Sequence, residues 1–177
     1  MTTVKKVLIG VAVLIALPFA AAAFVPRSFT VEREVTINRP REEVFDYLKH
    51  LKNQEQWSKW ARLDPAAKKS YRGTDGTVGF VSAWESTSSD VGTGEQEIKA
   101  IREGERLDVE IRITQPFQST DPAYTLTESV SDGVTRVKSG YLGKMNYPMN
   151  LLCPSVEAKI GADMAEGLST LKGVLEK

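Results

Sequence analysis

The strongest constraint in this 177-residue chain is an apolar run near its N-terminus. Nineteen consecutive residues, Val7–Val25, carry no charge, hydroxyl or amide; Lys5 and Lys6 precede the run and Arg27 follows it. At 1.5 Å per residue the run makes a helix of about 28 Å, close to the ~30 Å hydrocarbon core of a bilayer. We therefore expect residues 1–27 to be an N-terminal membrane segment, with residues 7–25 inside the membrane.

Two interpretations of this segment remain open. An uncleaved transmembrane helix fits the length of the run, whereas a cleavable signal peptide fits its basic start and the small residues Ala20–Ala23. Phe24 and Val25 extend the run beyond the ~7–15 residues of a usual signal core, which favours the transmembrane helix. Basic residues before the run keep the N-terminus in the cytoplasm by the positive-inside rule. The domain is then extracytoplasmic on a single-pass anchor, or secreted or periplasmic after cleavage.

Residues 28–177 have the length of one domain, and their composition excludes several classes of function. The whole chain has 23 basic and 23 acidic residues; without residues 1–27 the balance is 20 against 23, a net charge of −3. Nucleic-acid binding requires a clustered excess of Lys and Arg, which is missing. One Cys and one His make neither an internal disulfide nor a closed zinc site. We expect no nucleic acid, no metal and no cofactor.

Hydrophobic periodicity predicts the first elements of this domain. Apolar and polar residues alternate over Phe29–Ile37, which is typical of a half-buried strand, with Arg33 as the one charged residue on the apolar face. Helical spacing follows over residues 40–51, and a second short helix is expected after Asn53. Two short helices should therefore follow the first strand.

Strand patterns fill the middle of the chain and a long helix ends it. Alternation over Thr77–Trp84, Leu107–Ile113 and Tyr124–Val130 is interrupted by Gly-containing turns and by no helical pattern, which indicates an antiparallel meander. From Val156 to Leu175 the apolar residues recur every three or four positions, as in an amphipathic helix. Only this helix is long enough to cover the inner face of a curved sheet. The sequence therefore predicts an α+β domain.

The order of several motifs is similar to that of the SRPBCC superfamily. The matching segments are Val35-Thr-Ile-Asn-Arg-Pro-Arg-Glu-Glu-Val-Phe-Asp-Tyr-Leu48, Trp57-Ser-Lys-Trp60, Tyr71-Arg-Gly73, Gly76-Thr-Val-Gly79, Val91-Gly-Thr-Gly94, Pro116-Phe117 and Gly167-Leu-Ser-Thr-Leu-Lys172. Over about residues 29–177 the chain resembles bacterial polyketide cyclase/dehydrase and lipid transport proteins of the START/Bet v 1-like group. The resemblance implies a helix-grip fold, a curved antiparallel sheet around the C-terminal helix, with a hydrophobic cavity. It implies no single chemistry, since this fold hosts carriers, receptors and enzymes.

Large amphipathic side chains are the candidates for lining such a cavity, because they combine apolar area with a polar group that orients a ligand. The candidate ligand-binding residues are Trp84, Phe80, Tyr124, Tyr71, Tyr147, Phe117 and Arg33. The alternative for the aromatic residues is core packing, and for Arg33 a structural or solvent-facing role.

Glu128 is the one weak candidate for catalysis. It has the same strand parity as Leu126 and Val130, so an inward orientation would place a carboxyl in an apolar cavity. Burial there would raise its pKa and suit it to general acid or base chemistry. A bulge would instead turn Glu128 to solvent.

Three functional hypotheses follow. The first is a membrane-tethered domain that binds a hydrophobic or lipid-like small molecule. The second is a cyclase or dehydratase that acts on a polyketide-like substrate in the same cavity, and the third is a protein-interaction domain at the membrane. Titratable groups that converge inside the cavity would favour the enzyme, and an exposed apolar patch without a cavity would favour the interaction domain.

Overall fold

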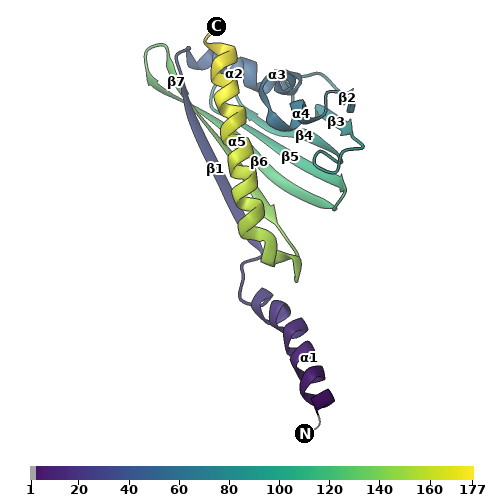
Figure 1. The fold of residues 1–177 in the computed structure, drawn as a ribbon. Helices are drawn as coiled ribbons and strands as arrows, with labels where there is room; N and C mark the ends of the chain where they lie inside the picture. The colour runs from purple at the N-terminus through teal and green to yellow at the C-terminus, as the bar shows by residue number, and fades with distance from the viewer. Residues whose placement is uncertain (1–2) are drawn as a thin grey trace.

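The computed structural model describes residues 3–177 and consists of an N-terminal helix followed by an α+β domain (Figure 1). The strands are β1 Ser28–Ile37, β2 Lys68–Arg72, β3 Val81–Glu85, β4 Thr93–Arg102, β5 Arg106–Gln115, β6 Ser119–Ser131 and β7 Val134–Lys144. The helices are α1 Thr3–Ala22, α2 Arg41–Lys49, η1 Leu51–Asn53, α3 Gln54–Trp57, α4 Lys59–Leu63, η2 Met149–Leu152 and α5 Cys153–Leu175. The seven strands form one antiparallel sheet in the order β1-β7-β6-β5-β4-β3-β2, and α5 lies across it. This confirms the predicted α+β helix-grip fold.

Helix α1 extends away from the domain without packing against it along its length (Figure 1). It is the one described helix that is long and apolar enough to cross a membrane, and none of its apolar window is buried. A signal sequence near an N-terminus has the same length and apolar composition.

One face of the sheet packs against helices, and we call it the inner face. Its first core cluster joins Ile37 of β1 and Val137 of β7 to Leu168 and Leu171 of α5, all of them at most 2% exposed. Antiparallel pairing places side chains of directly opposed residues on the same face. The second core cluster, beneath α2 and η1, consists of Phe45, Leu51, Phe80, Ile98 and Leu107.

Glycine lets α5 pass close to β1 at one point. A Cβ atom at Gly161 would lie 2.2 Å from an Nη of Arg33, so a larger residue would displace the guanidinium. In contrast, a Cβ atom at Gly173 would have no neighbour within 4 Å. A side chain at Gly161 would therefore have to shift the end of the exposed Arg33 side chain, whereas Gly173 has open space.

Two local predictions were wrong. The second short helix is split into α3 and α4 at Ser58, which has extended backbone angles, and Asn53 donates its side-chain amide to the Tyr47 carbonyl (2.8 Å) instead of capping α3. The strand expected from Thr77 begins only at Val81, because Gly79 adopts a positive φ of 86° that belongs to a loop.

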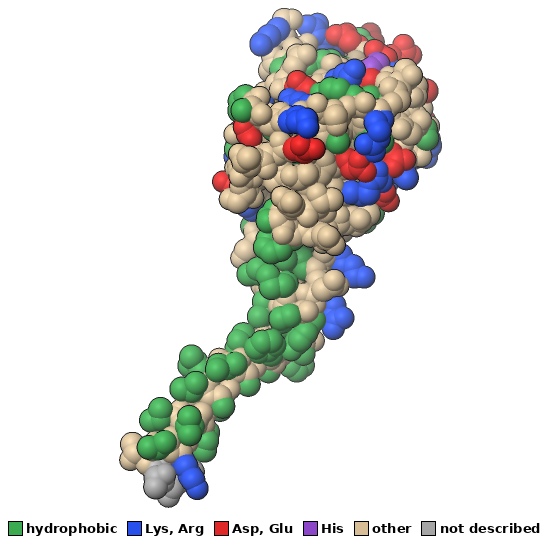
Figure 2. All heavy atoms as spheres, turned by 90° about the vertical axis from the view of Figure 1, so that its right-hand side faces the viewer, with side chains coloured by type: hydrophobic (Ala, Val, Ile, Leu, Met, Phe, Trp, Pro, Cys, Tyr) green, Lys and Arg blue, Asp and Glu red, His purple; other side chains and the backbone are tan. Residues whose placement is uncertain are grey.

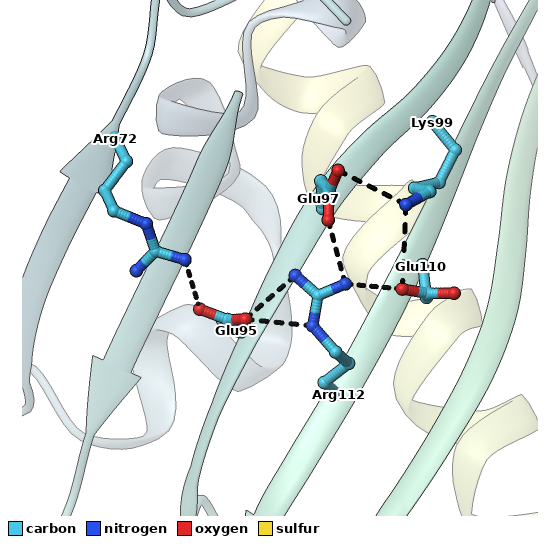
Figure 3. A network of polar contacts seen from close by, with 6 residues as sticks. All are labelled: Arg72, Glu95, Glu97, Lys99, Glu110 and Arg112. Atoms are coloured by element: carbon cyan, nitrogen blue, oxygen red, sulfur yellow. Dashed lines mark hydrogen bonds and ion pairs between the residues drawn. The ribbon is translucent and has the colours of Figure 1, made fainter. Parts of the chain in front are cut away.

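The outer face of the sheet carries a network of charged side chains (Figure 3). Arg112 of β5 lies at its centre and contacts three carboxylates: Glu95 at 2.8 Å, Glu97 at 2.8 Å and Glu110. Arg72 and Lys99 contact these glutamates from the two sides of the network. The polar outer face and the mainly apolar inner face place any apolar ligand site on the inner side.

Candidate ligand-binding site

The inner face changes from closed to open along the sheet. Near α2 and η1 its side chains are fully buried, whereas toward the other end they are only half-buried and helices cover less of the sheet (Figure 1). We call the half-buried part the inner strip; it consists of Trp84, Ile111, Ile113, Ala123, Ser139 and Tyr141. These side chains come from four strands, β3, β5, β6 and β7. Gln96 of β4, the strand between β3 and β5, is also half-buried on this face, so the largely apolar inner strip has a polar side chain beside it.

An open pocket lies at the end of the inner strip, and we call it the basal pocket. It has a volume of about 520 Å³ and opens at the edge of the sheet, where side chains of both faces line it: Ile113, Ser119 and Asp121 of the inner face, Arg112, Thr114 and Thr120 of the outer face, and Gln118, Lys144 and Asn146. Residues from the end of β5, the start of β6 and the end of β7 therefore meet there. Ile113 belongs to both surfaces and joins the inner strip to the pocket.

A buried polar pair lies where the two surfaces join. The phenol of Tyr141 donates a hydrogen bond to Oδ2 of Asp121 (2.8 Å), and Asp121 is only 3% exposed. Burial, together with the hydrogen bond to Asp121, holds the pKa of Tyr141 well above its ordinary value. Tyr141 therefore stays a hydrogen-bond donor at neutral pH, and Asp121 lines the pocket as an acceptor.

The basal pocket lies at the end of the domain that carries α1. Lys144, a lining residue, pairs with Ser28 at the start of β1, and the Met145 amide donates to the Arg27 carbonyl (2.8 Å). The chain that leaves α1 therefore runs beside the pocket.

Three predicted ligand residues lie on the inner side of the sheet. Trp84 belongs to the inner strip, and its indole Nε1 donates to the Val91 carbonyl (3.3 Å). Phe80 is 1% exposed and is a core residue. Tyr71 stacks on Phe80 with ring centroids 6.1 Å apart and donates its phenolic hydrogen to Glu55. Of the three, only Trp84 lies in the half-buried strip.

Two further predictions placed residues on the wrong face. Tyr124 and Glu128 share the outer face of β6: Tyr124 stacks against the Arg106 guanidinium at 4.4 Å and hydrogen-bonds to Glu32. The ring fits there because its cross-strand neighbour is Gly140, where a Cβ atom would lie 2.2 Å from it. The Glu128 side chain is 57% exposed and pairs with Arg136 (3.7 Å). Neither side chain faces the cavity side of the sheet.

The remaining predicted residues lie at the edges of the site. Arg33 has the inner-face parity of β1, but it is exposed beside Gly161 of α5. Phe117, in the β5–β6 turn next to the basal pocket, is 71% exposed. Tyr147 donates its phenolic hydrogen to the carbonyl of Phe19 in α1 (3.2 Å). Phe117 and Tyr147 thus mark the end of the domain near the anchor.

Sequence reasoning missed Asp121 and Tyr141. Asp121 shares its parity with Ala123, Thr125 and Thr127, a row of small or polar residues that does not look like a buried strand face. Pro122, the next residue, also gives no indication that Asp121 is buried. The two residues come together only through the pairing of β6 with β7. Within residues 3–177, no group of three or more His, Cys, Asp or Glu side chains is arranged to hold a metal ion.

Comparison with known families gives one match that covers most of the chain. The model of the family described as polyketide cyclase / dehydrase and lipid transport matches residues 28–176. A search of the curated proteins by sequence found no match. The match begins at the first strand and ends one residue after α5.

Solved structures with the same fold come from diverse sources. The solution structure of the Aha1 dimer from Colwellia psychrerythraea has a TM-score of 0.58 and 14% identity, covering 84% of this chain and 96% of that one. Protein MLL2253 from Mesorhizobium loti has a TM-score of 0.61 and 15% identity, with coverages of 83% and 96%. Ara h 8.0201 has a TM-score of 0.54 and 19% identity, with coverages of 84% and 97%. At these identities the likeness shows the shared fold alone.

Proposed function

Because the chain belongs to the polyketide cyclase/dehydrase and lipid transport family, we propose that residues 28–177 bind a hydrophobic or lipid-like small molecule and that α1 tethers them to a membrane. One observation carries the proposal: the half-buried inner strip continues into the open basal pocket. A ligand that covers apolar surface of this kind lowers the free energy by about 25 cal/mol for each Å² removed from water.

The polarity of the site favours an amphiphile over a pure hydrocarbon. Ile111, Ile113 and Ala123 offer apolar contacts along the inner strip, and Asp121 accepts hydrogen bonds at its end. Lys144 adds a positive charge at the mouth of the pocket. An apolar chain on the strip and a polar group in the basal pocket would therefore satisfy both surfaces.

The tether rests on α1 itself. The twenty residues of α1 form a helix of about 30 Å, the thickness of a bilayer core, in which Lys5 and Lys6 at the start are the only charged residues. None of its apolar window is buried against the domain. Lys5 and Lys6 at the start of the helix favour a cytoplasmic N-terminus, which puts the domain on the opposite side.

Native mass spectrometry of the full-length chain, extracted in mild detergent, tests ligand binding. We expect co-purified amphiphiles, or uptake of phospholipid from phosphatidylcholine vesicles. The Ser139→Trp variant should lose most of this occupancy, because the indole fills the inner strip at a half-buried position. Leu142→Trp places the same group on the outer face of the same strand and should keep it. An empty wild-type chain that takes up no lipid would refute the binding function.

The Asp121–Tyr141 pair favours an enzyme as the second candidate function. Two titratable groups that converge beside an apolar surface suit acid–base chemistry on a polyketide-like substrate, as in a cyclase or dehydratase. Asp121 replaces Glu128 as the candidate base in this hypothesis, because Glu128 lies on the outer face.

A comparison of extracted ligands separates the two functions. If the domain only binds, wild type and Asp121→Asn should carry the same compounds, in different amounts. If it is a dehydratase, Asp121→Asn should accumulate a compound heavier than the wild-type product by one water. Tyr141→Phe is the matched variant, because it removes the donor of the same hydrogen bond.

A further inference from the structure

A buried asparagine fastens the end of α1 to the domain. The side-chain amide of Asn150 donates to the carbonyl of Ala22 (2.6 Å) and to that of Val25 (2.8 Å). The last carbonyls of a helix have no partner within the helix, so an external donor satisfies them. Asn150 is 0% exposed, and Ala22 beside it is 1% exposed. The contact therefore has the burial of a core contact, although it joins the domain to a terminal helix.

A second contact holds the same junction. Tyr147 donates to the Phe19 carbonyl (3.2 Å), and the two rings pack with centroids 6.3 Å apart. Asn150 and Tyr147 both lie in the segment between β7 and α5. Loss of α1 would remove the Ala22 carbonyl, one of the two acceptors of the buried Asn150 amide, which costs free energy. The two contacts therefore favour retention of α1.

Apolar side chains surround this junction and are exposed. We call them the anchor-side rim; it consists of Phe24, Tyr147, Met149 and Leu152, which are 89%, 43%, 45% and 45% exposed. Figure 2 shows hydrophobic side chains that continue from α1 onto the base of the domain, with Lys or Arg side chains beside them. Two exposed basic residues lie close to the rim residues in the sequence: Arg27 follows Phe24, and Lys144 precedes Tyr147. Exposed apolar groups next to basic groups are the composition of an interfacial membrane surface.

We propose that the Asn150 cap fixes the domain on α1 so that the anchor-side rim lies in the headgroup layer of the membrane that α1 spans. The basal pocket, which lies at the same end, then opens toward that layer. An amphiphile passes between this membrane and the inner strip without crossing bulk water. This proposal rests on the membrane tether of the proposed function. The partner that contacts the anchor-side rim is the lipid interface itself.

Fluorescence quenching in vesicles tests this arrangement on the full-length chain. A cysteine is introduced either in the rim, as Met149→Cys, or in the distant β6–β7 turn, as Asp132→Cys, and is labelled with an environment-sensitive fluorophore. Native Cys153 is 4% exposed, and burial and Glu157 raise the pKa of its thiol, so it stays unlabelled at neutral pH. The vesicles contain phosphatidylcholine and a nitroxide phosphatidylcholine that quenches near the headgroups.

Interfacial groups insert ~5–10 Å into a bilayer, so we expect quenching at Met149→Cys at least about threefold above that at Asp132→Cys. Adding Asn150→Ala should lower the quenching at Met149→Cys toward the level of the turn. Asn38→Ala is the matched control, because this exposed asparagine follows β1 at the end away from α1 and makes no side-chain bond to the described part of α1. Equal quenching at the two labels, or no effect of Asn150→Ala in a folded variant, would overturn the proposal.

Two measurements separate the possible failures. The intact mass of the membrane-extracted chain reports whether α1 is retained; a chain that begins after Ala22 lacks the tether and one acceptor of the Asn150 amide, which contradicts both the tether and this proposal. A retained α1 with a blue-shifted, unquenched label at Met149→Cys shows that a protein covers the rim, which also contradicts the lipid interface. Loss of ligand in native mass spectrometry with intact quenching refutes only the binding function. If Asn150→Ala does not fold, the comparison of the two labels alone still decides.

Discussion

Tyr141 and Asp121 form a hydrogen bond of 2.8 Å between adjacent strands on the inner face of the sheet, where the carboxylate is almost completely buried. They are diagonal neighbours, because Tyr141 lies directly opposite Ala123. The pair gives this largely apolar surface a fixed hydrogen-bond donor and acceptor. A ligand that competes for Asp121 must offer its own hydroxyl or amine donor.

This pair predicts a non-additive double-mutant cycle. Tyr141→Phe leaves a buried carboxylate without its donor, so we expect a loss of about 2 kcal/mol in the free energy of unfolding. Asp121→Ala should cost a similar amount, and the double variant should cost less than the two single changes together. Thermal unfolding of the detergent-solubilised chain, followed by tryptophan fluorescence, measures all three. If the two losses are additive, the hydrogen bond between these side chains makes no net contribution to the free energy of unfolding.

The sequence predicts the elements whose periodicity is simple. β1, β5 and α5 show regular apolar spacing, and the structure has them close to the expected positions. β2 escapes prediction because Lys68–Arg72 is an edge strand with mostly exposed polar side chains. A strand at an edge needs no apolar alternation, since little of it is buried.

The face of β6 could not be read from its residues. Tyr124 and Leu126 are the largest apolar side chains of the strand, yet they lie on the outer face, and small residues such as Ala123 face inward. Arg106 and Gly140 stabilise the Tyr124 ring there, one by stacking and the other by leaving space. These contacts to Tyr124 come from neighbouring strands. They depend on the strand register, which the local sequence of β6 does not give.

The close approach of α5 to β1 predicts different effects of alanine at two glycines. Gly173→Ala should stabilise the chain by about 0.5–1 kcal/mol, since alanine favours helix and nothing lies within 4 Å of the added Cβ. Gly161→Ala should gain less, because the Cβ must displace the Arg33 guanidinium from 2.2 Å.

Shortening the arginine provides the control for this comparison. In an Arg33→Ala background, Gly161→Ala should recover the same gain as Gly173→Ala, and melting temperatures would detect it as a shift of about 2–4 °C per kcal/mol. If Gly161→Ala is already fully stabilising with Arg33 present, the contact between the helix and the guanidinium is not close.

The charged network on the outer face predicts an acid-dependent loss of stability. Hydrogen bonds from Arg72 and Arg112 lower the pKa of Glu95, and those from Arg112 and Lys99 lower the pKa of Glu97 (Figure 3). Carboxylates with lowered pKa values stabilise the folded state above their ordinary pKa, and this contribution disappears as the pH falls through the lowered value. The melting temperature should therefore fall as the pH is taken from about 6 to about 3.

Arg112→Gln should weaken this pH dependence and destabilise the neutral-pH protein by about 1–2 kcal/mol, the range for charge-assisted hydrogen bonds in a partly solvated network. Arg136→Gln is the matched control; Arg136 meets only the exposed Glu128, at 3.7 Å, so we expect almost no change. Equal acid sensitivity of wild type and Arg112→Gln would show that the acid-labile carboxylates lie elsewhere.

Tyr71 predicts the opposite behaviour at alkaline pH. Burial and its hydrogen bond to Glu55 raise the pKa of Tyr71 from 10.0 to about 12. Its contribution to stability is complete below the unfolded pKa of 10.0 and is lost as the pH rises through the folded value, because the unfolded chain releases the proton first. Tyr71→Phe should lower the melting temperature at pH ~8, where the hydrogen bond is lost, and should match wild type more closely near pH 11. Tyr147→Phe, at the anchor end, controls for the loss of a phenol. A difference between wild type and Tyr71→Phe that stays constant from about pH 8 to about pH 11 would exclude a raised pKa at this residue.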